Sequence, residues 1–150
     1  MIERYLKKGD QFLDVGTGSG ILTVAAARLG TGKGIGIDKN EAAVKIARRN
    51  LRTNKIKPHR FNVRTGNLLD EIEARYDLVA ANILREIIAK LWDDIPRVLK
   101  NGGVFICSGM LVGNTQRIEK KMIMTGLEIL EKRSKIGWVA IAAKLNHQRK

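Results

Sequence analysis

The sequence has little of what marks several common protein classes. It contains one cysteine, two prolines and 5% aromatic residues among its 150 residues. The single cysteine, Cys107, has no partner for a disulfide or a metal cluster, and its apolar neighbours predict a buried side chain. No apolar run approaches the roughly 18 residues of a membrane span, and the amino-terminal residues lack the apolar centre of a secretion signal. These absences predict a cytoplasmic protein without a membrane segment.

Acidic residues are also scarce relative to basic ones. The sequence has 28 Lys and Arg against 15 Asp and Glu, a formal net charge of +13, and no acidic residue lies between Ala42 and Leu69. Basic residues gather in that region: Lys45, Arg48, Arg49, Arg52, Lys55, Lys57, Arg60 and Arg64. This basic stripe, Lys45–Arg64, predicts contact with RNA or the ribosome, although a solvated basic surface would give the same pattern. Because Phe61 is its only aromatic residue, the stripe does not predict base stacking.

The hydrophobic content and its pattern predict the fold class. With 44% hydrophobic residues, the chain can bury the core of one domain, 1–150, whereas two smaller domains would each have a marginal core. Short β-rich apolar runs predict strands at Gln11–Val15, Gly34–Asp38, Arg60–Thr65, Tyr76–Asn82, Gly103–Ser108, Leu127–Ile136 and Trp138–Leu145. Helical periodicity predicts helices at Gly20–Leu29, Glu41–Thr53, Arg85–Leu99 and Asn114–Thr125. The alternation is typical of a doubly wound, mostly parallel α/β sheet with helices on both faces, which ends in an antiparallel hairpin around Gly137.

The segment Phe12–Gly20 runs from an apolar strand through a glycine turn into a helix. It departs from the dinucleotide-binding pattern Gly-x-Gly-x-x-Gly, because Ile21 stands where the last glycine should be if Gly16 and Gly18 are the first two. Asp14, at the strand end, would repel a diphosphate but attract an ammonium or sulfonium, since opposite charges about 4 Å apart gain about 4 kcal/mol before desolvation. S-adenosylmethionine carries both cations, and its carboxylate suits the turn amides. The predicted cofactor-binding residues here are Asp14, Gly16, Thr17 and Gly18; the alternative is a turn without a ligand.

Asp38 is a second candidate for cofactor contact. It ends an apolar run about twenty residues after the glycine turn, where a doubly wound fold places the carboxylate that binds the ribose hydroxyls. The alternative is that Asp38 only caps the helix predicted to begin at Glu41. Both roles are compatible, and the joint spacing of Asp14, the glycines and Asp38 favours the ribose contact.

Four segments make the sequence resemble a known family. They are Leu13–Leu22, Ala80–Leu84, Ser108–Leu111 and Gly137–Ala140. The sequence resembles the class I S-adenosylmethionine-dependent methyltransferases and, more narrowly, the PrmA family, which methylates ribosomal protein L11. This resemblance implies a Rossmann-like sheet of order 3-2-1-4-5-7-6, S-adenosylmethionine as cofactor and a protein amine as acceptor. The family normally has a separate amino-terminal recognition domain and a Gly-Thr-Gly-x-His-x-Thr-Thr segment, which these 150 residues lack, so we expect a catalytic fragment or a stand-alone relative.

The resemblance also implies roles for two asparagines. Asn82 ends the fourth predicted strand, where the family's asparagine contacts the cofactor and related amine methyltransferases hold the acceptor nitrogen. Its amide oxygen can accept a hydrogen bond from an amine and so aim the lone pair at the methyl carbon; the alternative is a turn residue. Asn67 matches the position that faces adenine in this superfamily, and Leu68 could donate its N–H to the ring. A plain Gly-Asn turn explains Asn67 equally well.

These observations predict an enzyme that transfers a methyl group from S-adenosylmethionine to an amine of a ribosomal or other protein, with Asn82 as its catalytic residue. Two alternatives remain: an RNA methyltransferase, which the net charge favours, and a non-catalytic module that binds the cofactor or RNA. No metal site is predicted, because Asp93 and Asp94 lack a third acidic partner.

Overall fold

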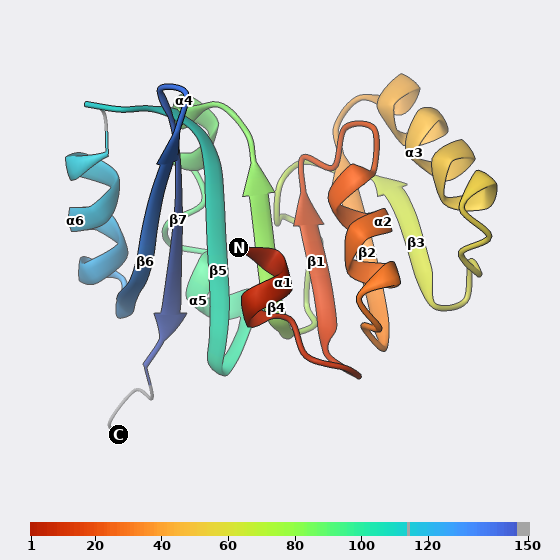
Figure 1. The fold of residues 1–150 in the computed structure, drawn as a ribbon, viewed down its shortest axis with the longest axis horizontal. Coiled ribbons are helices and arrows are strands. Elements are labelled where there is room, and N and C mark those ends of the chain that lie inside the picture. The colour runs from red at the N-terminus through yellow and green to blue at the C-terminus, as the bar shows by residue number, and fades with distance from the viewer. Residues whose placement is uncertain (114, 147–150) are drawn as a thin grey trace.

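The fold is built around one twisted sheet. The computed structural model describes residues 1–113 and 115–146, and its sheet has the strand order β3-β2-β1-β4-β5-β7-β6 (Figure 1). The strands are β1 (Gln11–Val15), β2 (Lys33–Asp38), β3 (Phe61–Thr65), β4 (Tyr76–Asn82), β5 (Leu99–Leu111), β6 (Leu127–Lys135) and β7 (Trp138–Leu145). Strands β1 to β5 run parallel, and β7 is antiparallel to both β5 and β6. The predicted sheet order and the closing antiparallel pair are confirmed.

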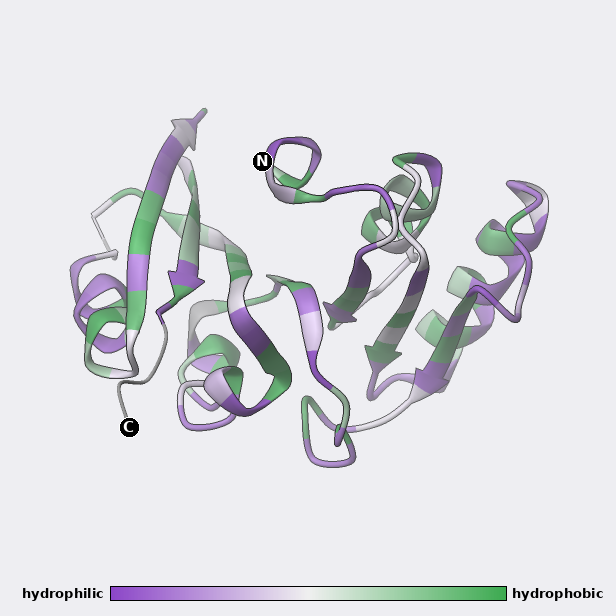
Figure 2. Ribbon diagram, turned by 90° about the horizontal axis from the view of Figure 1, so that it is seen from below, coloured by the Kyte–Doolittle hydropathy of each residue, from purple (hydrophilic) through white to green (hydrophobic). Residues whose placement is uncertain are grey.

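Helices cover both faces of the sheet. One face carries α1 (Ile2–Tyr5), α2 (Ile21–Arg28) and α3 (Glu41–Thr53), and the other carries α4 (Arg85–Ile88), α5 (Ile95–Val98) and α6 (Gln116–Met124) (Figures 1 and 2). Because successive side chains of a strand point to opposite faces, Phe12 packs into the core under α2 and α3, whereas Leu13 packs into the core under α4 to α6. The central strands β1 and β4 are therefore buried on both faces, as their continuous apolar runs require.

The predicted helix Arg85–Leu99 is wrong. The segment forms two short helices, α4 and α5, joined by tight turns, and Leu99 already belongs to β5. Pro96 explains the break, because proline has no N–H to continue a helix but fits its first turn, where it stands in α5. The apolar spacing still reports burial, since Leu91 and Trp92 lie in the core.

Other element boundaries differ by a few residues. Strand β5 begins at Leu99 and ends at Leu111, beyond both predicted limits, and α1 is an additional short helix. Helix α6 begins at Gln116; Asn114, where a helix was predicted to begin, lies outside the described residues.

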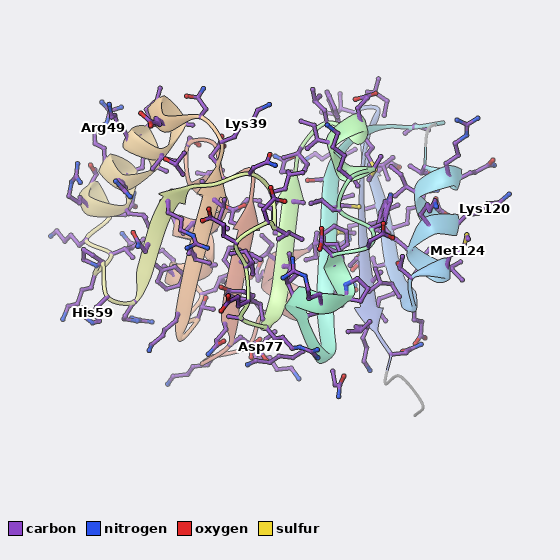
Figure 3. The ribbon with its side chains drawn as sticks, turned by 180° about the vertical axis from the view of Figure 1, so that it is seen from behind. Lys39, Arg49, His59, Asp77, Lys120 and Met124 are labelled. Atoms are coloured by element: carbon purple, nitrogen blue, oxygen red, sulfur yellow. The ribbon has the colours of Figure 1, made fainter. Side chains whose placement is uncertain are left out.

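The parallel strands bring the candidate residues to one edge of the sheet. The glycine turn follows β1, Asp38 ends β2, Asn67 follows β3 and Asn82 ends β4. Figure 3 shows Lys39, directly after β2, at this edge and Asp77, near the start of β4, at the opposite edge. The carboxyl edge of an open α/β sheet is where ligands bind.

Candidate cofactor and acceptor site

The glycine turn between β1 and α2 forms one wall of the candidate cofactor site. Gly16, Gly18 and Gly20 have φ angles of 70°, 55° and 80°, which residues with side chains rarely adopt. A Cβ atom at Gly16 would lie 2.3 Å from Cγ2 of Ile83, whereas one at Gly18 would meet no atom within 4 Å. The turn is therefore closed against Ile83 at one end and open to a ligand at Gly18.

Three amide groups of the turn already have acceptors within the protein. The N–H groups of Gly16 and Thr17 donate to the Ile37 carbonyl at 2.8 and 2.9 Å. The Gly18 N–H donates to Oδ2 of Asp38 at 2.9 Å. These bonds hold the turn to the end of β2, so a bound carboxylate would have to share these amides.

Asp14 lies beneath the turn rather than on its surface. It is 1% exposed, and its Oδ2 accepts hydrogen bonds from the hydroxyls of Thr17 at 2.6 Å and Thr23 at 2.8 Å. Burial raises the pKa of the Asp14 carboxyl, and these hydroxyls oppose the rise. Direct contact between Asp14 and a cationic ligand stays a prediction; the geometry places the Asp14 carboxyl group just below the turn.

The hydroxyl of Thr23 offers a test of how the buried Asp14 carboxyl ionises. Because the pKa of Asp14 is raised in the folded protein, the folded state binds more protons than the unfolded chain between the two pKa values, and stability falls as pH rises through the folded-state value. Thr23→Val removes one donor to the carboxylate, and such a charge-assisted bond contributes about 1.5–3 kcal/mol. We expect the free energy of unfolding to fall by up to that amount, and by more at about pH 7 than at about pH 4, because the ionised fraction of the carboxyl increases with pH.

Urea unfolding at both pH values measures this difference. Thr31→Val is the matched control, because Thr31 is also fully buried but its hydroxyl donates to the Ala26 carbonyl and not to a carboxylate. An equal loss of stability at both pH values for Thr23→Val would contradict the role of the Asp14 charge.

Asp38 stands between the glycine turn and the start of α3. Its Oδ2 accepts from the Gly18 N–H, and its Oδ1 accepts from the Asn40 N–H at 2.9 Å. The cap of α3 is Asn40, whose side chain accepts from the Ala42 N–H at 2.9 Å, so the alternative that Asp38 caps this helix is wrong. Asp38 lines a cavity of about 260 Å³, and its oxygens keep lone pairs for further donors.

Asn67 and Leu68 line the same cavity, together with Gly16 and Ile83. The Asn67 side-chain nitrogen donates to Oδ2 of Asp70 at 2.7 Å, and the Asp70 N–H donates to the Asn67 carbonyl at 3.2 Å. Asn67 is thus part of a turn and part of the cavity wall at once. Its contact with adenine stays a prediction.

Asn82 lies in a second, neighbouring groove of about 630 Å³ between the ends of β4 and β5 and the β6–β7 hairpin. Its Oδ1 accepts a hydrogen bond from the Ser108 hydroxyl at 3.0 Å. Trp138, which is 53% exposed, and Lys135 also line this groove. Ile83 lines both the groove and the cavity at Asp38, so the two spaces are adjacent at this residue.

Sequence reasoning did not single out Ile83 and Ser108, which the structure places at the candidate site. Both stand inside segments that carry the family resemblance, Ala80–Leu84 and Ser108–Leu111, and that is the signal that could have found them. Their contacts depend on the packing of β4, β5 and the glycine turn, which no local pattern encodes.

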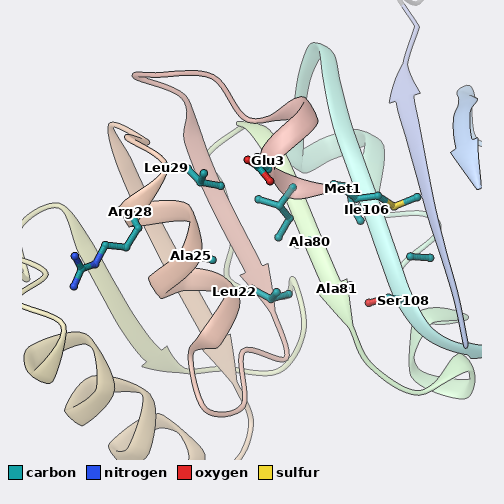
Figure 4. Close-up of a pocket in the computed structure, with 12 residues that line it drawn as sticks. Met1, Glu3, Leu22, Ala25, Arg28, Leu29, Ala80, Ala81, Ile106 and Ser108 are labelled. Carbon is teal, nitrogen blue, oxygen red and sulfur yellow. The ribbon is translucent and has the colours of Figure 1, made fainter. Parts of the chain in front are cut away.

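A third cavity, of about 560 Å³, lies between α1 and α2 over the sheet (Figure 4). Its walls are mostly apolar and include Leu22, Ala80 and Ile106, while Arg28 points away from it in Figure 4. Ser108 lines this cavity as well as the groove at Asn82. The cavity therefore extends along the face of the sheet that carries α1 and α2 and reaches the carboxyl edge at Ser108.

Three side chains of the basic stripe make hydrogen bonds to the backbone. The side chains of Arg48, Arg60 and Arg64 donate to backbone carbonyls at 2.5–2.9 Å. Arg48 and Arg60 are nevertheless exposed, as are the other five: Lys45, Arg49, Arg52, Lys55 and Lys57. Figure 3 shows Arg49 pointing outward from α3. Because β2 and β1 separate β3 from β4, this stripe lies to one side of Asn82.

Three further observations concern the cysteine, metal sites and membrane spans. Cys107 is buried as predicted, and burial raises the pKa of its thiol to about 12. Within residues 1–113 and 115–146, no group of three or more His, Cys, Asp or Glu residues could hold a metal ion. No helix in the described part of the chain combines the length and the apolar character needed to cross a membrane.

Comparison with known proteins identifies relatives. A family model described as ribosomal protein L11 methyltransferase (PrmA) matches residues 1–146. A protein of that name from Brevibacillus brevis is 45% identical over 143 residues, which cover 95% of this chain and 45% of the relative. One from Dictyoglomus thermophilum is 42% identical over 144 residues, covering 96% and 47%. The chain thus spans about half the length of the curated relatives it matches.

Solved structures agree with these matches. A ribosomal protein L11 methylase from Lactobacillus delbrueckii subsp. bulgaricus superposes with a TM-score of 0.92 at 31% identity, covering 97% of this chain and 75% of that one. An RNA methyltransferase from Salinibacter ruber in complex with S-adenosyl-L-homocysteine shares the fold, with a TM-score of 0.79 at 19% identity over 99% of this chain and 90% of that one. The chain belongs to the ribosomal protein L11 methyltransferase (PrmA) family.

Proposed function

We propose that this chain carries an S-adenosylmethionine-dependent methyltransferase site that acts on an amine of a protein, with ribosomal protein L11 as the first acceptor to test. The observation that carries the proposal is that two adjacent spaces share Ile83 as a lining residue. One is the cavity beside the glycine turn and Asp38, and the other is the groove that contains Asn82. Methyl transfer needs two ligands in adjacent sites, and this arrangement supplies them.

The residues around the first cavity fit S-adenosylmethionine. Asp38 would accept hydrogen bonds from the ribose hydroxyls, and Asn67 and Leu68 would stand at the adenine. Gly18 leaves open space where the ligand would pass, above the buried Asp14 carboxyl. The cavity of about 260 Å³ is close to the lower limit of about 300 Å³ for ligand pockets. When bound, the cofactor supplies an electrophilic methyl group on a sulfonium.

The groove supplies what an amine acceptor needs. An amine reacts through a free lone pair, yet the lysine side chain has a pKa of about 10.4 and is mostly protonated at neutral pH. Lys135 lines the groove, and a nearby positive charge lowers the pKa of an amine. The Asn82 oxygen can then accept a hydrogen bond from the neutral amine and orient its lone pair.

The surface around Asn82 favours a protein acceptor over RNA. Leu84, Leu111 and Trp138 are 63%, 51% and 53% exposed there, and apolar side chains suit a polypeptide better than a phosphate backbone. The names of the curated relatives, ribosomal protein L11 methyltransferase, support the same choice. RNA as the acceptor is the second candidate, supported only by the net charge.

Transfer of a tritiated methyl group from S-adenosylmethionine separates the alternatives. Total ribosomal protein and ribosomal RNA are offered as acceptors in parallel reactions, and label in protein is the expected result. Label in RNA alone would replace the proposal with the second candidate. Label in neither, together with S-adenosylhomocysteine binding by calorimetry, would indicate a non-catalytic module.

The exposed part of the basic stripe carries a separate prediction. We infer that it contacts the phosphates of ribosomal RNA, so the affinity of the chain for ribosomal RNA should fall steeply with salt. The double variant Arg49→Ala and Arg52→Ala should reduce the slope of log K against log salt by about 2. Lys120→Ala with Lys121→Ala, on α6 at the other end of the sheet, is the matched control. An equal effect of both pairs would reduce the stripe to a solvated basic surface.

A further inference from the structure

Ser108 contacts the one polar side chain that we place at the acceptor. Strands β4 and β5 are parallel, and Ser108 is the register partner of Asn82. The Ser108 hydroxyl donates to Oδ1 of Asn82 at 3.0 Å. A serine and an asparagine that are 26 residues apart in sequence are thus joined at the carboxyl edge of the sheet.

The backbone around Ser108 is shaped for this contact. The pairing of β5 with β7 shifts register between Cys107 and Met110, so Ser108 and Gly109 form a bulge. Gly109 has a φ of 91°, and a Cβ atom there would lie 2.6 Å from the Ile83 carbonyl oxygen. The backbone of β5 therefore passes close to Ile83, the residue after Asn82. Bulges beside binding sites re-aim a side chain, and this one sets Ser108 toward the amide.

We propose that Ser108 is a positioning residue that fixes the orientation of the Asn82 amide toward the acceptor. The proposal rests on the proposed function for its catalytic consequence. The terminal torsion of an asparagine side chain is broad, so an unheld amide samples many orientations. The Ser108 hydroxyl occupies one lone pair of Oδ1 and leaves the other for the acceptor amine. The bulge and the close approach at Gly109 keep the hydroxyl in place.

The first measurement observes Asn82 itself and needs no methyl transfer. In the ¹⁵N-labelled chain, the side-chain amide signal of Asn82 is identified by its disappearance in Asn82→Ala. We expect Ser108→Ala to shift this signal and increase its fast motion, and Ser108→Thr, which keeps a hydroxyl, to restore it. Thr53→Ala removes an exposed hydroxyl at the end of α3 and should leave the signal unchanged. An unchanged Asn82 signal in Ser108→Ala would overturn the proposal.

The second measurement is a double-mutant cycle on methyl transfer to ribosomal protein L11. Ser108→Ala should lower kcat by about 10-fold, the value of one net hydrogen bond, with KM and S-adenosylhomocysteine affinity changed by less than about 2-fold. In the Asn82→Ala background the same change should cost nothing more. An equal loss in both backgrounds would show that Ser108 acts independently of Asn82 and would refute the positioning role. If the unmodified chain transfers no methyl group to any acceptor, the proposed function fails, and the Asn82 signal alone decides the proposal.

Discussion

Replacing Asn82 with alanine should lower methyl transfer to ribosomal protein L11 by about 100-fold, because a misplacement of about 1 Å at the reacting atoms costs that much. The loss should appear in kcat. Asn82 lines the groove, whereas the cavity at Asp38 is lined by other residues. We therefore expect the affinity for S-adenosylhomocysteine, measured by calorimetry, to change little. Circular dichroism should show an unchanged fold, since Asn82 is exposed at the end of β4.

Two results would contradict this assignment in different ways. Turnover of Asn82→Ala at the rate of the unmodified chain would remove Asn82 from the reaction. A drop in S-adenosylhomocysteine affinity that accounts for the whole loss would make Asn82 a cofactor ligand only. Asn101→Ala is the matched control, because Asn101 is an exposed asparagine at the opposite end of β5.

The fold could be predicted from the sequence where local signals agree. Strands such as Gln11–Val15 are short apolar runs closed by glycines, and a glycine turn before an amphipathic segment favours a β-strand followed by a helix. The order of the strands came from the family resemblance, because local patterns do not say which strands pair. The prediction of one helix at Arg85–Leu99 was wrong because apolar spacing indicates only which residues are buried. Leu91 and Trp92 are buried here by two short helices joined by turns, and the same spacing is expected of one long helix.

The position of a site residue could be predicted where it directly follows a strand of the parallel sheet. Asp38 could be placed because the carboxyl ends of two adjacent parallel strands meet, and the Gly18–Asp38 bond joins them. The hydrogen bonds of Asp14 could not be predicted, because its partner Thr23 reaches it only once the first turn of α2 has formed. Ser108 depends on the register of β4 and β5 and on a bulge, neither of which leaves a signature in sequence.

Asp38→Ala should weaken S-adenosylhomocysteine binding by about 100-fold. Hydrogen bonds to a charged group contribute about 1.5–3 kcal/mol each, and loss of the carboxylate removes up to two with the ribose. It also releases the Gly18 N–H, which Asp38 holds at 2.9 Å, so part of the loss will come from a looser glycine turn. Asp93→Ala is the control, because Asp93 is an exposed acid in the turns between α4 and α5.

A ligand without ribose hydroxyls separates the two contributions. Calorimetry compares S-adenosylhomocysteine with its 2′,3′-dideoxy analogue on the unmodified chain and on Asp38→Ala. If Asp38 binds the ribose, the analogue binds the unmodified chain weakly, and Asp38→Ala costs it much less than it costs the parent ligand. An equal loss for both ligands would assign Asp38 to holding the glycine turn alone. Since the Gly18–Asp38 bond exists without a ligand, only the difference between the two ligands measures ribose recognition.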